Sequence, residues 1–113
     1  MEECIFCKIA NKEIPSKIVL ENEKVIAFED LNPIAPVHIL VIPKKHIASV
    51  MGLKEEDTEY WKAVYEAIQE IAKQKGVDKT GFRVLTNVGD DAGQTIKHLH
   101  FHVIGGRKLE MGC

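Results

Sequence analysis

The chain has 113 residues, 45% of them hydrophobic, and a formal net charge of −2, which fits one globular domain over residues 1–113. This weak charge excludes a basic field that would hold nucleic acid non-specifically. The chain has no apolar run long enough to span a membrane, and Met1-Glu2-Glu3 is an acidic start unlike a signal peptide, so we expect a cytoplasmic protein that binds neither nucleic acid nor membrane.

Turn-forming residues divide the chain into segments with helical or alternating hydrophobic patterns. The patterns predict a short helix at 4–12, strands at 17–21, 25–29 and 37–42, a long helix at 54–75, and strands at 82–88 and 98–104. The long helix has one apolar face, formed by Trp61, Val64, Ile68, Ile71 and Ala72. The order of the elements predicts an α+β fold, with a mostly antiparallel five-stranded sheet against the long helix.

Three of the five histidines alternate along the last predicted strand, at His98, His100 and His102. Successive side chains of a strand point to opposite faces, so the three imidazoles share one face while Leu99 and Phe101 point into a core. Two interpretations of this row are open. The imidazoles bind a metal together, or the central one attacks phosphorus while a neighbour handles charge or protons. A metal on His100 would occupy the lone pair that a nucleophile needs.

The polar loop at residues 89–97, just before this strand, suits a phosphate group. Gly93 lets the backbone approach a ligand closely, and Gln94 and Thr95 can donate hydrogen bonds. The same composition is also typical of a solvated loop without a ligand. The histidines that follow the loop favour the functional interpretation.

Several segments together resemble the histidine triad (HIT) superfamily. Residues 98–104 match its pattern His-φ-His-φ-His-φ-φ, in which φ is apolar. The likeness to the Hint branch, the nucleoside phosphoramidases, extends over nearly the whole chain, through residues 5–9, 27–30, 38–46, 93–95 and 105–107. The resemblance implies a HIT-like fold and a homodimer, in which the long helix and a strand of each subunit meet.

The resemblance also implies which residues bind the phosphate and perform the reaction. His100 corresponds to the nucleophile that becomes transiently nucleotidylated, His102 helps to hold the α-phosphate, and His38 orients the triad. The segment Gly93-Gln94-Thr95 and the side chain of Asn87 would also reach the phosphate. An alternative for His38 is a strand histidine with a purely structural hydrogen bond.

The sugar and the base have their own implied residues. Asp30, with Leu31 beside it, would hold the ribose hydroxyls. The purine would be walled by Ile5, Phe6, Ile9 and Phe28. Each of these four apolar residues would equally suit an ordinary core.

The implied activity is hydrolysis of purine nucleoside 5′-phosphoramidates through a nucleotidyl-histidine at His100, releasing a nucleoside monophosphate and an amine. One alternative is a dinucleoside polyphosphate hydrolase, although that branch usually has a proline where this chain has Gly105-Gly106. Others are a nucleotide-binding or scaffolding protein with incidental hydrolysis, and a metal sensor centred on Cys4 and Cys7. The amine and the choice between adenine and guanine stay open.

Cys4 and Cys7 have the spacing of half a zinc site. Many bacterial triad proteins and the related galactose-1-phosphate uridylyltransferases carry a structural zinc on this pattern, and the resemblance implies that His46 and His98 complete it. The alternative is two reduced cysteines packed as small apolar side chains. No catalytic metal is required in either case. We expect Cys113 to be exposed and without a role.

The C-terminal tail departs from the family pattern. Many relatives end in a Trp-Pro sequence that reaches toward the partner's active site and shapes the choice of amine. Met111 stands where that tryptophan would be, so the amine preference of this chain is open. Thr95 replaces the commoner serine and keeps a hydroxyl that can donate to phosphate.

Overall fold

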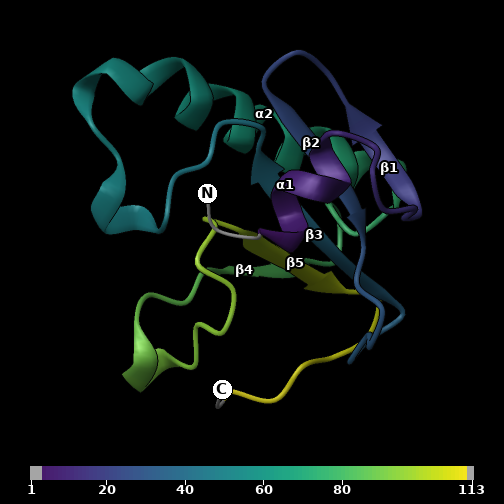
Figure 1. Ribbon diagram of the computed structural model, residues 1–113. Helices are drawn as coiled ribbons and strands as arrows, with labels where there is room; N and C mark the ends of the chain where they lie inside the picture. Colours follow the sequence, from purple (N-terminus) through teal and green to yellow (C-terminus); the bar gives the residue numbers. More distant parts are fainter. Residues whose placement is uncertain (1–3, 112–113) are drawn as a thin grey trace.

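The structure is a computed structural model that describes residues 4–111 (Figure 1). The acidic start and Cys113, for which the sequence raised expectations, lie outside the described residues. The elements follow in the predicted order: α1 (Ile5–Ala10), β1 (Ile18–Glu21), β2 (Val25–Glu29), β3 (Val37–Pro43), α2 (Thr58–Gln74), β4 (Phe82–Leu85) and β5 (Phe101–Gly105). Within residues 4–111, no helix is both long enough and apolar enough to cross a membrane.

The five strands form one sheet in the order β1-β2-β3-β5-β4, and each neighbouring pair is antiparallel. The predicted antiparallel five-stranded sheet with one long helix is therefore confirmed. The β1–β2 turn is closed by Asn22, whose Oδ1 accepts hydrogen bonds from the N–H groups of Lys24 and Val25 at 2.9 and 3.0 Å. A short polar side chain that binds the backbone nearby in this way stabilises a tight turn.

Helices pack on both faces of the sheet, α2 on one and the short α1 on the other (Figure 1). Val41 of β3 packs in the cluster that contains Ile71 of α2. Its neighbour Leu40 packs in the cluster that contains Phe6 of α1. Adjacent strand residues thus serve different layers, as the two-residue period of a strand requires. The central strand β3 is buried on both faces for this reason.

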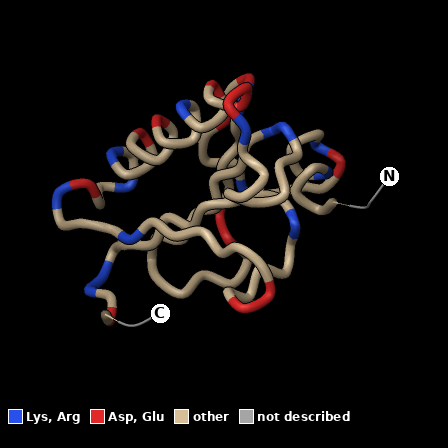
Figure 2. Tube along the Cα trace, turned by 90° about the vertical axis from the view of Figure 1, so that its left-hand side faces the viewer, with Lys and Arg blue, Asp and Glu red and all other residues tan. Residues whose placement is uncertain are grey.

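The apolar face of α2 is largely as predicted. The predicted residues that are buried against the sheet are Val64, Ile68, Ile71 and Ala72. Trp61 differs, because 44% of its surface stays exposed, although its ring lies 5.6 Å from that of Phe101. Acidic and basic residues are distributed along the outer side of the helix (Figure 2), which keeps that side in water.

The α-helix begins at Thr58 rather than at residue 54. A 3₁₀ turn at Glu55–Asp57 precedes it, and Asp57 Oδ2 accepts a hydrogen bond from the Lys54 N–H at 3.0 Å. The other carboxylate oxygen pairs with Lys45 Nζ at 2.5 Å. The Lys45 ammonium lowers the pKa of the buried Asp57 carboxyl, so the carboxylate stays charged and joins the helix start to the segment after β3.

Two strand boundaries differ from the prediction by three residues, while the start of β1 and the ends of β3 and β5 differ by one. β5 begins at Phe101 rather than at His98, and β4 ends at Leu85 rather than at residue 88. The Thr86 hydroxyl donates to the His100 carbonyl at 2.7 Å and so takes the place of a ladder hydrogen bond. β3 ends at Pro43, and because proline has no backbone N–H, it cannot donate the hydrogen bond that would extend the pairing with β5.

The segment after β5 is held by two arginines. Gly106 has a φ of +91°, and a Cβ there would lie 3.0 Å from Pro36 Cβ, so the chain leaves the strand in a conformation that favours glycine. The Arg107 guanidinium donates to the Ile34 carbonyl at 2.7 Å. Arg83 of β4 donates to the carbonyl of Glu110 at 2.6 Å, which fixes the path of the tail.

Candidate active site

The central histidine of the triad has one ring nitrogen fixed by the backbone. His100 is buried, and its Nδ1 lies 2.7 Å from the carbonyl oxygen of His98. A carbonyl only accepts, so Nδ1 carries the proton and donates, and Nε2 of a neutral ring is left with a free lone pair. The sequence places this imidazole on the α1 side of the sheet, where its ring centroid lies 5.0 Å from that of Phe6.

His102 and His38 form the next part of the site. The N–H of Ile34 donates to His38 Nδ1 at 3.2 Å, so the proton of a neutral His38 is on Nε2. This Nε2 lies 2.9 Å from His102 Nδ1 and 3.4 Å from Asp30 Oδ2. When His38 donates to His102, the proton of His102 must be on Nε2. The two triad rings thus present opposite functions, a lone pair on His100 and an N–H on His102.

Burial keeps His102 uncharged. It lowers the pKa of His102 from 6.5 to about 4, and the neighbouring His100 and His38 contribute in the same direction. Asp30 acts in the opposite sense and raises this pKa. His102 is therefore a neutral hydrogen-bond donor near neutral pH.

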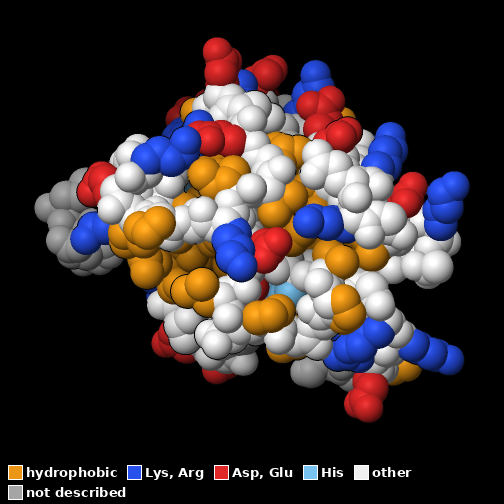
Figure 3. Space-filling model, turned by 90° about the vertical axis from the view of Figure 1, so that its right-hand side faces the viewer, with side chains coloured by type: hydrophobic (Ala, Val, Ile, Leu, Met, Phe, Trp, Pro, Cys, Tyr) orange, Lys and Arg blue, Asp and Glu red, His pale blue; other side chains and the backbone are white. Residues whose placement is uncertain are grey.

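A groove of about 250 Å³ adjoins these histidines through two of its lining residues, Phe6, whose ring centroid is 5.0 Å from that of His100, and Asp30, which lies 3.4 Å from His38. All six residues assigned to the base and the ribose line it, namely Ile5, Phe6, Ile9, Phe28, Asp30 and Leu31. The rings of Phe6 and Phe28 meet edge to face, with centroids 5.6 Å apart. On the face of the molecule shown in Figure 3, a histidine lies in a hollow bordered by hydrophobic side chains. The groove is apolar with a few polar groups, as is typical of sites for flat organic ligands.

Seven further residues line the groove, and the sequence analysis missed them. They are Ile14, Pro15, Ser16, Glu29, Asn32, Leu40 and Ile96. Leu40 had a recognisable pattern, since it is opposite both Phe28 and His102 in the sheet register and shares their face. Ile14, Pro15 and Ile96 belong to loops, where no periodicity indicates which way a side chain points.

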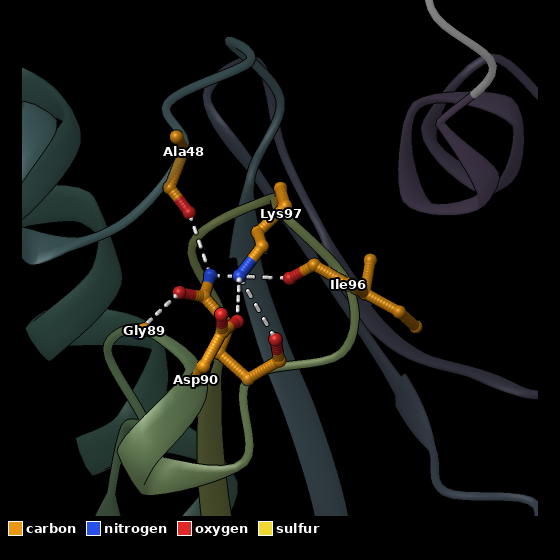
Figure 4. A network of polar contacts seen from close by, with 6 residues as sticks. Ala48, Gly89, Asp90, Ile96 and Lys97 are labelled. Carbon is orange, nitrogen blue, oxygen red and sulfur yellow. Dashed lines mark hydrogen bonds and ion pairs between the residues drawn. The ribbon is translucent and has the colours of Figure 1, made fainter.

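The loop before β5 differs in detail from the expectation. Gln94 is buried, and both of its amide hydrogens are used, since Nε2 donates to the carbonyls of Ala48 at 2.7 Å and Ile96 at 3.1 Å (Figure 4). Its Oε1 accepts from the Gly89 N–H at 2.9 Å. The side-chain amide of Gln94 therefore shapes the loop in this conformation, and the assignment of the Gly93-Gln94-Thr95 segment to the phosphate stays a prediction.

The remaining residues assigned to the phosphate lie outside the lining of the groove. Gly93 has a φ of +78° at the end of the 3₁₀ turn Asp90–Ala92, so it needs the backbone freedom of glycine. Thr95 is exposed and Asn87 is half-buried. Both positions remain accessible to a ligand, and their roles stay predictions.

The two cysteines and two histidines predicted to bind a metal lie together. The four donor atoms of Cys4, Cys7, His46 and His98 are all within 4.8 Å of one another. Cys4 Sγ is 3.3 Å from His98 Nδ1, and Cys7 Sγ is 3.2 Å from His46 Nδ1. Burial and the neighbouring Cys4 raise the pKa of Cys7 to about 11. His98 Nε2 donates to the Pro43 carbonyl at 2.9 Å, so Nδ1 faces the sulfurs with its lone pair.

The histidine row is divided between two clusters rather than acting as one metal site. His98 belongs with the cysteines, whereas His102 groups with Asp30 and His38. His100 lies between them and uses one nitrogen on the backbone. A single ion bound by all three imidazoles, which the sequence left open, is not supported by this arrangement.

We predict that the free energy of unfolding falls as the pH falls from 6.5 to about 4. His102 stays neutral in the fold but is protonated in the unfolded chain, so the unfolded state binds more protons in this interval. Urea denaturation at several pH values should show a smaller loss for His102→Asn than for the wild-type chain. The other histidines are common to both proteins, so equal losses would contradict the prediction.

Comparison with known proteins places these features in one family. The model of the HIT domain matches residues 11–109. A histidine triad protein from Clostridium difficile is 53% identical and superposes with a TM-score of 0.91, covering 97% of each chain. A HIT family hydrolase from Legionella pneumophila is 38% identical with a TM-score of 0.93, over 96% of this chain and 97% of that one.

A more distant structure extends the likeness. The histidine triad nucleotide-binding protein from Candida albicans is 31% identical with a TM-score of 0.83, over 98% of this chain and 86% of that chain. The histidine pattern, the five-stranded sheet and the extent of these matches agree with one another. On these grounds the chain belongs to the HIT domain family.

Proposed function

We propose that this protein is a purine nucleoside phosphoramidase of the Hint branch. The observation that carries the proposal is the ring of His100, whose Nδ1–H is held by a carbonyl while Nε2 is left to attack. This nitrogen belongs to a ring in contact with Phe6, which lines a groove suited to a base and a sugar. One relative is described as a hydrolase and another as a nucleotide-binding protein, and together these descriptions support a hydrolase that acts on a nucleotide.

The reaction proceeds in two displacements at phosphorus. Nε2 of His100 attacks phosphorus, the amine nitrogen takes a proton from water, and the bond from phosphorus to this nitrogen breaks as the amine leaves. The product on the enzyme is a nucleotidyl-imidazolium that keeps its Nδ1–H on the His98 carbonyl. A water molecule then attacks phosphorus and loses a proton to the solvent, the bond to the imidazole breaks with its electron pair returning to Nε2, and the nucleoside monophosphate is released. The N–H of His102 stabilises charge on the non-bridging oxygens.

Two other functions from the sequence analysis remain as competitors. A dinucleoside polyphosphate hydrolase would use the same nucleophile with a nucleotide as leaving group. The pair Gly105-Gly106 stands where that branch usually has a proline, and this difference in sequence favours the phosphoramidase. A scaffolding role would not require a His100 ring whose Nε2 lone pair is left free, so this feature favours an enzyme.

We predict that the wild-type chain, mixed with adenosine 5′-phosphoramidate and quenched in denaturant, carries a nucleotide adduct on the peptide that contains His100. His100→Asn should show no adduct, and its turnover should fall by about 1,000-fold or more because the nucleophile is lost. Mass spectrometry of the quenched peptides makes the measurement.

The same experiment separates the alternatives. His102→Asn should still form the adduct at His100, only more slowly, because its nucleophile is intact. Faster turnover of diadenosine triphosphate than of the phosphoramidate would favour the polyphosphate hydrolase. An adduct on His98 or His102 would show that the roles are assigned wrongly.

We further propose that the cluster of Cys4, Cys7, His46 and His98 holds a structural zinc ion. Tetrahedral zinc, with bonds of about 2.3 Å to sulfur and about 2.0 Å to nitrogen, separates such ligands by about 3.5 Å. The sulfur–nitrogen distances of 3.2, 3.3 and 3.5 Å match this value. Four protein ligands would close the site, so the ion would join α1 to the sheet and take no part in the reaction.

The zinc proposal predicts close to one zinc ion per purified chain, together with a lower melting temperature after chelation. Cys7→Ser should lose most of the metal, since it removes a thiolate ligand. Cys113→Ser is the matched control, because it removes a thiol outside the proposed site and should keep the zinc. Elemental analysis and thermal unfolding give the two readouts. Equal metal content in the two variants would contradict the proposal.

The dimer implied by the family resemblance has a suitable surface. β4 is an edge strand, with β5 on one side only. Val84 of this strand is 43% exposed, on the face of the sheet that α2 covers. Trp61 and Tyr65 of α2 are exposed to a similar extent, at 44% and 42%. We propose that a second copy of the chain pairs with β4 and covers these side chains.

The proposed dimer predicts a solution mass of twice the chain mass for the wild-type protein. Val84→Lys should shift the mass to that of a monomer, because a lysine on an edge strand opposes strand pairing. Ile18→Lys is the matched control, since Ile18 is 42% exposed on the other edge strand, β1. Light scattering after size-exclusion chromatography measures the mass. A wild-type monomer, or a dimer in Val84→Lys, would contradict the assignment.

A further inference from the structure

One side chain in the groove has a hydrogen-bonding group without a partner. Among the described residues 4–111, Ser16 Oγ is the only buried side-chain nitrogen or oxygen atom without a hydrogen bond. An unpaired buried hydroxyl destabilises a fold, so such a group calls for an explanation. Ser16 lines the groove beside the histidines, and the family resemblance gave it no role.

Neighbouring backbone contacts fix where Ser16 lies. The Lys17 carbonyl accepts a hydrogen bond from the Glu29 N–H at 3.0 Å, so Ser16 comes just beyond the paired end of β1 and β2. Asp30 follows Glu29 at the same end of β2. Ser16 and Asp30 therefore flank the end of the β1–β2 pair that borders the groove.

The sheet register gives the order of the groups along the groove. His102 of β5 is opposite Leu40 of β3, which is opposite Phe28 of β2, which is opposite Ile18 of β1. Three steps between strands of about 4.8 Å each separate β1 from the histidines by about 14 Å. Along this row of strands His102 thus lies at one end and the strand that follows Ser16 at the other, with Leu40 and Phe28 between them.

We propose that the Ser16 hydroxyl is the group that hydrogen-bonds the edge of the nucleobase. The inference rests on the proposed function, which puts the phosphate at the histidines and so puts the base at the Ser16 end. A hydroxyl both donates and accepts, so it fits the polar edge of a purine. Ser16 is a specificity residue in this assignment and has no part in the bond-breaking steps.

The conformation of Ser16 is suited to this role. Its oxygen is shielded, and rotation about the Cα–Cβ bond offers two other staggered positions about 120° away. Since the hydroxyl makes no hydrogen bond to the described residues 4–111, turning it to a ligand breaks none of these contacts. The hydrogen bond to the base therefore adds to affinity without a loss elsewhere.

The test compares Ser16→Ala with Ser49→Ala, the chain's other serine. Ser49 Oγ accepts a hydrogen bond from the Met51 N–H at 3.1 Å, which is a structural contact. The probes are AMP, GMP and ribose 5-phosphate, which lacks the base. Isothermal titration and competitive inhibition give the affinities, and thermal unfolding gives the stability of the unliganded chains.

Ser16→Ala should bind AMP or GMP, or both, roughly 2- to 10-fold more weakly, which is the worth of one hydrogen bond. Its affinity for ribose 5-phosphate and its melting temperature should not fall. Ser49→Ala should show the reverse pattern, with a lower melting temperature and unchanged nucleotide affinity.

The outcomes separate the two proposals. If the wild-type chain binds none of the nucleotides, the proposed function fails, and the inference fails with it. If the wild-type chain binds AMP or GMP and Ser16→Ala binds them equally well, the role of Ser16 alone is wrong. An equal loss for AMP and ribose 5-phosphate, or a lower melting temperature of Ser16→Ala, would also overturn the role in base recognition.

Discussion

The hydrogen bond from His100 Nδ1–H to the His98 carbonyl is the contact on which the proposed chemistry depends. It exists because the backbone leaves the strand pattern before Phe101, so the His98 carbonyl is free to accept from a side chain. The His98 ring is itself anchored to the Pro43 carbonyl at the end of β3. The sheet therefore determines the reactive nitrogen through a short chain of backbone contacts, and the strand boundary is part of the site.

His102 is oriented by a similar series of hydrogen bonds, but it presents a donor where His100 presents a lone pair. The backbone N–H of Ile34 fixes one nitrogen of His38, His38 in turn donates to His102, and His102 is left with a donor. His100 and His102 each have one nitrogen committed to the protein and one available to a substrate, whereas both nitrogens of His38 are used within the protein. A site assembled in this way needs no rearrangement of protons before a phosphorus centre arrives, which is the advantage of preorganisation.

Much of this arrangement follows from local patterns in the chain. The period of two puts His100 and His102 on the face opposite Phe101, and the helical period puts Ile71 of α2 against the sheet. The resemblance to the family assigned Phe6 and Phe28 to the wall of the groove, and both side chains line it. These features depend on neighbours in sequence, so the sequence expresses them directly.

Other features depend on partners far along the chain. The fate of the Gln94 amide is decided by the Ala48 carbonyl, 46 residues away, and no pattern within the loop indicates it. The start of β5 is decided partly by Thr86, which lies outside that segment. Ser16 stands in a loop without periodicity, so only the three-dimensional arrangement reveals that its oxygen has no partner.

The two arginine contacts beyond β5 have an evolutionary consequence. Arg107 and Arg83 donate to main-chain oxygens, those of Ile34, Lys108 and Glu110, and within residues 4–111 neither is paired with a side chain of the tail. These contacts therefore set the path of the tail backbone, and they do not depend on which side chains the tail carries. Met111, at 93% exposure, shows how little the anchored route constrains the side chain displayed there. Substitutions at Met111 can accordingly change the surface of the tail and leave these backbone contacts in place.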